Sequence, residues 1–106
     1  MDTIKEVSPQ ALLVMLKDTE SQVQILDVRE HDEVADQPYQ GLETLHVPMQ
    51  TVPNKIKDFN KEATWVIACR SGGRSYKVAQ FLQTQGFSDV YNLAGGVLAW
   101  QEIKNI

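Results

Sequence analysis

Short apolar segments alternate with amphipathic segments along the whole chain, and this alternation restricts the folds that the chain can adopt. The segments that predict strands are VQILDVR (23–29), TLHVP (44–48), TWVIAC (64–69) and DVYNLAGG (89–96). TWVIAC is unbroken in its apolar character, as expected of a central strand that is covered on both faces. Strands that alternate with helices of about ten residues form βαβ units. The sequence therefore predicts an α/β fold in which helices pack on both faces of a parallel sheet.

The segments between these strands carry helix signals. Ser8 and Pro9 are typical of a helix start, because serine caps free N–H groups and proline loses no hydrogen bond at the first helical position. SYKVAQFLQTQG (75–86) is the strongest helix, and Gly86 is expected to end it in the left-handed conformation. HDEVADQ (31–37), VPNKIKDF (52–59) and VLAWQEI (97–103) predict shorter helices. The pattern leaves the path between Pro38 and Met49 open.

Length and charge narrow the class of protein further. A chain of 106 residues is expected to form one domain over residues 1–106. Its net charge of -4 and pI near 5.0 argue against nucleic acid, which is bound by clustered basic residues. No apolar run is long enough to span a membrane. The single cysteine, which has no disulfide partner in the chain, favours a reducing compartment, and we expect a cytoplasmic protein.

The loop CRSGGRS, residues 69–75, carries the main chemical signal. Its two adjacent glycines permit backbone conformations closed to other residues, and such a loop at a helix start can direct several N–H groups at one anion. The same groups, together with nearby arginines, lower the pKa of a thiol and so make it a better nucleophile. We predict that Cys69 is the catalytic nucleophile. The predicted substrate-binding residues are Arg70, Ser71, Gly72, Gly73, Arg74 and Ser75.

A lone cysteine at a strand end is more often a small buried core residue than a nucleophile. The flanking residues favour the nucleophile here, because glycines and arginines do not improve an apolar core but do serve an anion site. One cysteine and two distant histidines form no metal-ligand cluster, so we expect neither a metal nor another cofactor.

Three separated motifs, LDVRE, CRSGGRS and VYNLAGGVLAW, occur in an order that resembles the single-domain rhodaneses, a sulfurtransferase family. The resemblance implies a three-layer sandwich with a five-stranded, mainly parallel sheet. It implies that Cys69 takes a sulfur from thiosulfate or a persulfide, becomes a persulfide itself, and passes the sulfur to cyanide or to a thiol, which can be a protein thiol. It also implies that Asp27 and Arg29 support the active loop, for which the alternative is a surface ion pair. The family's GHIPGA-like stretch is reduced here to HVP.

Two other functions stay open. A cysteine phosphatase or arsenate reductase also places a thiolate in an anion cradle, but such enzymes have five residues between the cysteine and the arginine, whereas four separate Cys69 from Arg74. Asp27 is the candidate general acid for that chemistry. The second alternative is a regulatory binding module or a sulfur carrier without turnover. For Arg70 and Arg74, both binding of the donor and support of the loop stay open.

Overall fold

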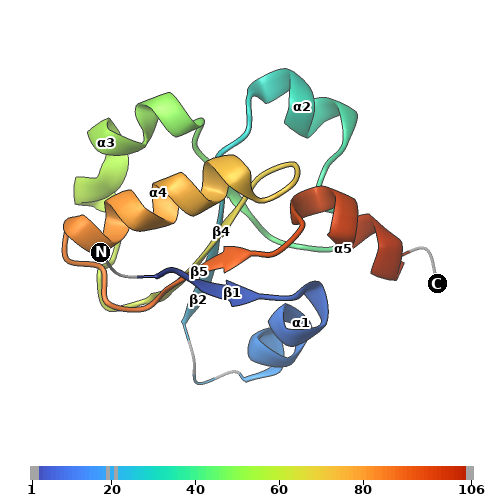
Figure 1. Ribbon diagram of the computed structural model, residues 1–106, viewed down its shortest axis with the longest axis horizontal. Coiled ribbons are helices and arrows are strands. Elements are labelled where there is room, and N and C mark those ends of the chain that lie inside the picture. Colours follow the sequence, from blue (N-terminus) through green and yellow to red (C-terminus); the bar gives the residue numbers. More distant parts are fainter. Residues whose placement is uncertain (1–2, 19, 21, 105–106) are drawn as a thin grey trace.

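The computed structural model describes residues 3–18, 20 and 22–104, and its strands form one sheet with helices on both faces (Figure 1). The sheet order is β1-β5-β4-β2-β3, and all four neighbouring pairs run parallel, which confirms the predicted fold class. The strands are β1 (Lys5–Val7), β2 (Val23–Asp27), β3 (Leu45–His46), β4 (Thr64–Ala68) and β5 (Val90–Leu93). As predicted, TWVIAC supplies the central strand, β4.

The strand β1 is absent from the pattern of apolar segments. It has three residues, of which only Val7 is buried, and it lies at the edge of the sheet beside β5. A single buried side chain gives no alternation to detect in the sequence. Pairing with β5, in the register Lys5 to Tyr91, defines this strand instead.

The helices follow the predicted segments closely. They are α1 (Pro9–Lys17), α2 (His31–Asp36), α3 (Val52–Lys55), α4 (Gly73–Thr84) and α5 (Gly96–Lys104), with 3-10 turns at Met49–Thr51 and Ile56–Asp58. Ser8 caps α1 by accepting a hydrogen bond from the N–H of Ala11. Gly86 has the expected positive φ of 94°. No helix in the described part of the chain has the length and apolar character needed to cross a membrane.

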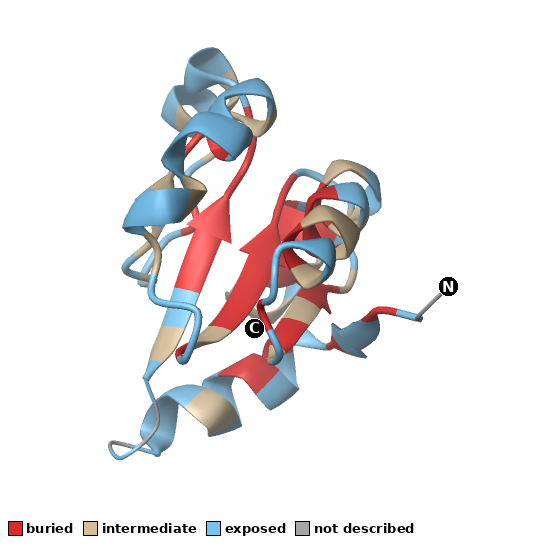
Figure 2. Ribbon diagram, turned by 90° about the vertical axis from the view of Figure 1, so that its left-hand side faces the viewer, coloured by how far each residue is buried: buried red, intermediate tan, exposed pale blue. Residues whose placement is uncertain are grey.

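Alternate residues of β4 face two separate cores. Trp65 and Ile67 pack with α4, whose stripe includes the buried residues Val78, Ala79 and Leu82. Val66 and Ala68 point to the opposite side, toward α1 and α5. The central strands are buried along most of their length (Figure 2). Cys69 continues the first of these faces, which places its side chain at the start of α4.

The segment from Pro38 to Met49, whose path the sequence left open, returns to the sheet and pairs in parallel with β2 through β3. A turn brings the N–H of Leu42 to the carbonyl of Tyr39, and the N–H groups of Val47 and Met49 then bond to the carbonyls of Asp27 and Val28, both at 3.0 Å. Tyr39 is buried. The segment therefore covers the carboxyl end of β2, directly beside the loop that contains Cys69.

The start of α5 closes over the same loop. The N–H of Val97 donates to the carbonyl of Cys69 at 3.0 Å, and the N–H of Leu98 donates to the carbonyl of Arg70 at 3.2 Å. This close approach depends on Gly96, which has a φ of 58° and where a Cβ atom would lie 2.4 Å from the carbonyl of Arg70. Glycine is required at this position both by its conformation and by the available space.

We expect Gly96→Ala to reduce the free energy of unfolding by about 2–4 kcal/mol. The alanine would have to adopt the left-handed conformation, and its Cβ atom would overlap the backbone of Arg70. Gly73→Ala is the matched control, since an added Cβ atom there meets no atom within 4 Å. That variant should stay within about 1 kcal/mol of the wild type. Urea unfolding followed by circular dichroism measures the free energy of unfolding of both variants. Equal stability of the two variants would contradict the account of how α5 meets the loop.

Candidate active site

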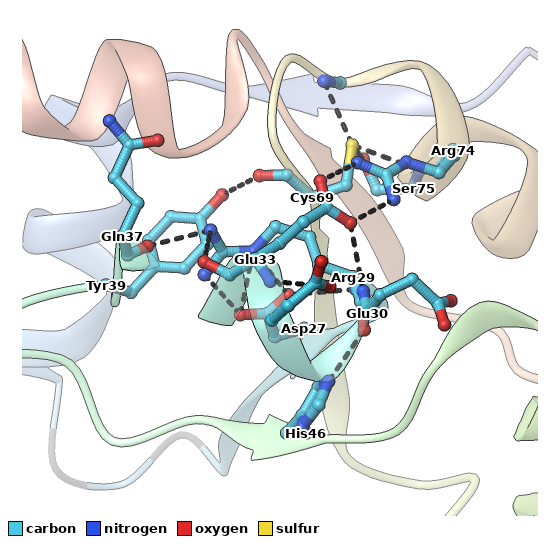
Figure 3. Close-up of polar contacts among 12 residues, drawn as sticks. Asp27, Arg29, Glu30, Glu33, Gln37, Tyr39, His46, Cys69, Arg74 and Ser75 are labelled. Carbon is cyan, nitrogen blue, oxygen red and sulfur yellow. Dashed lines mark hydrogen bonds and ion pairs between the residues drawn. The ribbon is translucent and has the colours of Figure 1, made fainter. Parts of the chain in front are cut away.

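The sulfur of Cys69 lies at the centre of the loop between β4 and α4. The N–H of Gly72 donates to it at 3.1 Å and the N–H of Ser75 at 3.5 Å, while the hydroxyl of Ser75 lies 3.2 Å away (Figure 3). The loop folds back in this way because Gly72 adopts a φ of 111°, which side-chain-bearing residues rarely do. The helix α4 begins at Gly73, two residues earlier than predicted, so its first turn forms part of the site.

The surroundings of Cys69 act on its pKa in two opposite directions. Burial raises the pKa of the thiol, which is only 1% exposed. The Ser75 hydroxyl and the N–H groups of Ser75, Gly72 and Ser71 lower it, because they donate to the charged sulfur. The hydrogen bonds outweigh burial, and the pKa of Cys69 lies below its ordinary value. The thiolate is therefore favoured by donors that the loop holds in place.

Asn92 on β5 controls the direction of the Ser75 hydroxyl. Its side-chain oxygen accepts a hydrogen bond from Ser75, while its Nδ2 donates to the carbonyl of Gly72 at 3.0 Å and to the Glu6 carboxylate at 3.1 Å. Ser75 has only one hydroxyl proton. While Asn92 accepts it, the Cys69 thiol can donate to the Ser75 oxygen, and once Cys69 is a thiolate the same proton can turn to the sulfur. The reasoning from sequence missed Asn92. The signal that could have found it is an amide inside the otherwise apolar strand segment VYNL.

The two arginines of the loop differ in their surroundings. Arg74 donates to both carboxylate oxygens of Glu33 on α2, each at 2.7 Å, and this contact lowers the pKa of Glu33 to about 2. The Arg70 side chain is exposed and makes no hydrogen bond or ion pair with the described residues. Neither guanidinium donates to the sulfur of Cys69 within that part of the chain. Glu33 was not predicted, since nothing in HDEVADQ marks it.

Asp27 and Arg29 form a buried ion pair, so the alternative of a surface pair is wrong. Their charged atoms lie 2.8 Å apart and each side chain is 1% exposed. Arg29 also donates to the carbonyl of Gln37 at 2.8 Å and lies over the ring of Tyr39, 4.9 Å from its centroid. The Tyr39 hydroxyl in turn donates to the carbonyl of Cys69. Through Tyr39, which the sequence did not reveal, this pair is connected to the active loop (Figure 3).

The predicted site residues therefore fall into two groups. Cys69, Gly72 and Ser75 meet at the sulfur, with the N–H of Ser71 contributing to its electrostatics. Gly73 is the first residue of α4. Arg74 binds Glu33, and Arg70 is exposed; neither arginine side chain hydrogen-bonds to the sulfur within the described part of the chain. Residues 3–18, 20 and 22–104 contain no group of three His, Cys, Asp or Glu side chains placed to hold a metal ion. The arrangement can stabilise an anionic sulfur by N–H and O–H donors alone.

Comparisons with known proteins give a consistent result. The family model of the rhodanese-like domain matches residues 8–103. A protein of Allochromatium vinosum named sulfurtransferase is 37% identical over 99 residues, which are 92% of this chain and 88% of that protein. A putative sulfur carrier protein of Bacillus subtilis, YrkF, is 32% identical over 98 residues, covering 92% of this chain and 51% of the relative. The crystal structure of a rhodanese-like domain protein from Staphylococcus aureus superposes with a TM-score of 0.80 at 34% identity, covering 92% and 91% of the two chains.

We expect Ser75→Ala to raise the pKa of Cys69, because the variant loses the hydroxyl that most strongly offsets burial. The rate of alkylation by iodoacetamide at pH 7 should fall about tenfold, the effect of losing one hydrogen bond to a charged group at the lower end of its range, about 1.5 kcal/mol. Ser71→Ala is the control, since it removes a hydroxyl from the same loop but keeps the N–H group. The role given to Ser75 is wrong if the two variants show the same pH dependence of alkylation.

Proposed function

This chain belongs to the rhodanese-like domain family, and from that membership we propose that it is a sulfurtransferase that carries sulfur as a persulfide on Cys69. The observation that supports the proposal most directly is the set of donors around the sulfur, two N–H groups and one hydroxyl within 3.5 Å. Donors in this arrangement stabilise a thiolate before the reaction and a charged persulfide after it. The reaction needs no proton relay to a leaving amine.

In the first step, the Cys69 thiolate attacks the outer sulfur of thiosulfate or of a persulfide. A bond forms between the two sulfur atoms as the S–S bond of the donor breaks, and its electron pair leaves with sulfite or with the donor's thiolate. No net oxidation occurs, because one S–S bond replaces another. The N–H groups of Gly72, Ser75 and Ser71 are the candidates for stabilising the new outer sulfur, while the exposed Arg70 is the candidate for attracting the anionic donor.

In the second step, cyanide or a thiol, including a protein thiol, takes the outer sulfur and regenerates the Cys69 thiolate. A cavity of about 610 Å³ opens beside the loop, and its lining includes Ser71, Gly72 and Tyr76. Cys69 does not line it, so the cavity offers an acceptor room beside the loop rather than at the sulfur itself. A lone reactive thiol of this kind works best where other thiols are kept reduced, so we assign the protein to the cytoplasm.

Phosphatase chemistry has less support. The ring between Cys69 and Arg74 is one residue shorter than a phosphatase needs, and Arg74 is already bound to Glu33. Asp27, the candidate general acid, is buried and bonded to Arg29, so it cannot protonate a leaving alcohol in this arrangement. We therefore retain sulfur transfer as the proposed chemistry. A sulfur carrier remains the second candidate, favoured by the similarity to YrkF.

We expect incubation with thiosulfate or a low-molecular-weight persulfide to add roughly 32 Da to the intact protein, because the thiolate gains one sulfur atom. Mass spectrometry should show the adduct disappear on addition of cyanide or dithiothreitol. Cys69→Ser, which keeps the loop's shape but has no thiol, should gain no sulfur. Absence of an adduct with both donors at neutral pH would overturn the proposal, and many turnovers with cyanide would favour an enzyme over a carrier.

A further inference from the structure

We propose that Glu33 determines the choice of sulfur donor, and that it favours a donor that brings one negative charge, an alkyl persulfide, over dianionic thiosulfate. The inference rests on the proposed function. It concerns a residue of α2 that lies 36 positions before Cys69 and does not touch the sulfur. Glu33 acts on the donor through Arg74.

Arg74 is held by Glu33 in the geometry that a guanidinium uses to bind an oxyanion. Two of its nitrogens each donate to one Glu33 oxygen at 2.7 Å, and the side chains are 36% and 27% exposed. Glu33 is itself fixed, since its Oε1 accepts the N–H of Glu30 at 3.0 Å in the capping box of α2. The sulfonate group of a donor must displace this carboxylate before it can bind Arg74 in the same two-pronged manner.

The charges around the loop then limit how much negative charge a sulfur donor can bring. Arg70 has no ion pair in the described part of the chain, whereas the charge of Arg74 is neutralised by Glu33 and also faces Glu30. Of the two arginines in the loop, only Arg70 is without an ion pair among the described residues, while the exposed Lys77 lies further along α4 and lines the neighbouring cavity. Thiosulfate brings two negative charges, shared between its three oxygens and the attacked outer sulfur, and the charge on the oxygens would lie near Glu33 and Glu30. An ionised persulfide brings only one at its reacting end.

The reaction with such a donor is balanced without any further reagent. The Cys69 thiolate attacks the outer sulfur of the alkyl persulfide, a new S–S bond forms at Cys69, and the alkyl thiolate leaves with the electron pair of the broken S–S bond. The leaving group carries a single charge, whereas thiosulfate would release dianionic sulfite. Arg70, the loop arginine that has no ion pair with the described residues, therefore matches both the donor and its leaving group.

The test compares two donors on four proteins. Intact-mass measurements give the second-order rate constant for sulfur addition to Cys69 from thiosulfate and from cysteine persulfide, whose net charge is -1. Glu33→Gln keeps an oxygen for the capping box while it removes the charge that holds Arg74. We expect this variant to raise the rate constant with thiosulfate about tenfold, the effect of one charge-assisted hydrogen bond at a part-exposed site. The rate constant with cysteine persulfide should change less than about threefold.

Two further variants separate this role from a general effect of charge. Asp36→Asn removes one negative charge from the same helix and should change neither rate constant by more than about twofold, since charges separated by solvent are screened. Adding Arg74→Gln to Glu33→Gln should abolish the gain with thiosulfate. The inference is overturned if Glu33→Gln changes the rate constants with both donors equally or leaves both unchanged. It is also overturned if Asp36→Asn has the same effect as Glu33→Gln. If no wild-type persulfide forms with either donor, the proposed function fails and this inference fails with it; if persulfide forms but the donor ratio does not move, only the inference fails.

Discussion

The sulfur of Cys69 is almost completely removed from solvent, and a charged sulfur in such a position must find hydrogen-bond donors to replace the lost water. The loop supplies them by turning back on itself at Gly72 and entering α4 directly. Two backbone N–H groups and one hydroxyl converge as a result. Most other features around the loop serve to keep those donors in place, because a displacement of an ångström would leave a buried thiolate without compensation.

The loop is supported from three directions. On the β2 side, the buried pair of Asp27 and Arg29 orders the segment that brings the Tyr39 hydroxyl to the carbonyl of Cys69. On the β5 side, Asn92 holds the carbonyl of Gly72. From the end of the chain, the first N–H groups of α5 bond to the carbonyls of Cys69 and Arg70. All three act on backbone carbonyls, and this leaves the N–H groups of the loop free to face the sulfur.

The sequence predicted those parts of this arrangement that depend on local pattern. An apolar strand that ends in Cys69, two glycines and a helix are neighbours in the chain, so their placement at one site follows from βα connectivity. The resemblance of LDVRE to the family motif implied that Asp27 supports the loop, and the structure connects Asp27 to the loop through Arg29 and Tyr39. The exact start of α4 was missed because the glycines, which have low helix propensity, begin the helix here.

The parts that were not predicted depend on contacts between distant segments. Glu33 meets Arg74 across 41 positions, and nothing in HDEVADQ distinguishes it from the other carboxylates of an exposed helix. The strand β1 is too short to show a pattern and exists through its pairing with β5. Tyr39 lies in the segment whose path was open, and its burial follows from packing against Arg29 rather than from any local signal.

The folded loop, and not the cysteine itself, makes the thiol acidic. This is measured by the pH dependence of Cys69 alkylation in the native protein and in the protein unfolded in urea. The native thiol should titrate at a lower pH than the unfolded one, because unfolding removes the N–H and hydroxyl donors together with the burial they outweigh. A native thiol that titrates at the same pH as the unfolded thiol, or at a higher pH, would show that burial prevails and would contradict the account.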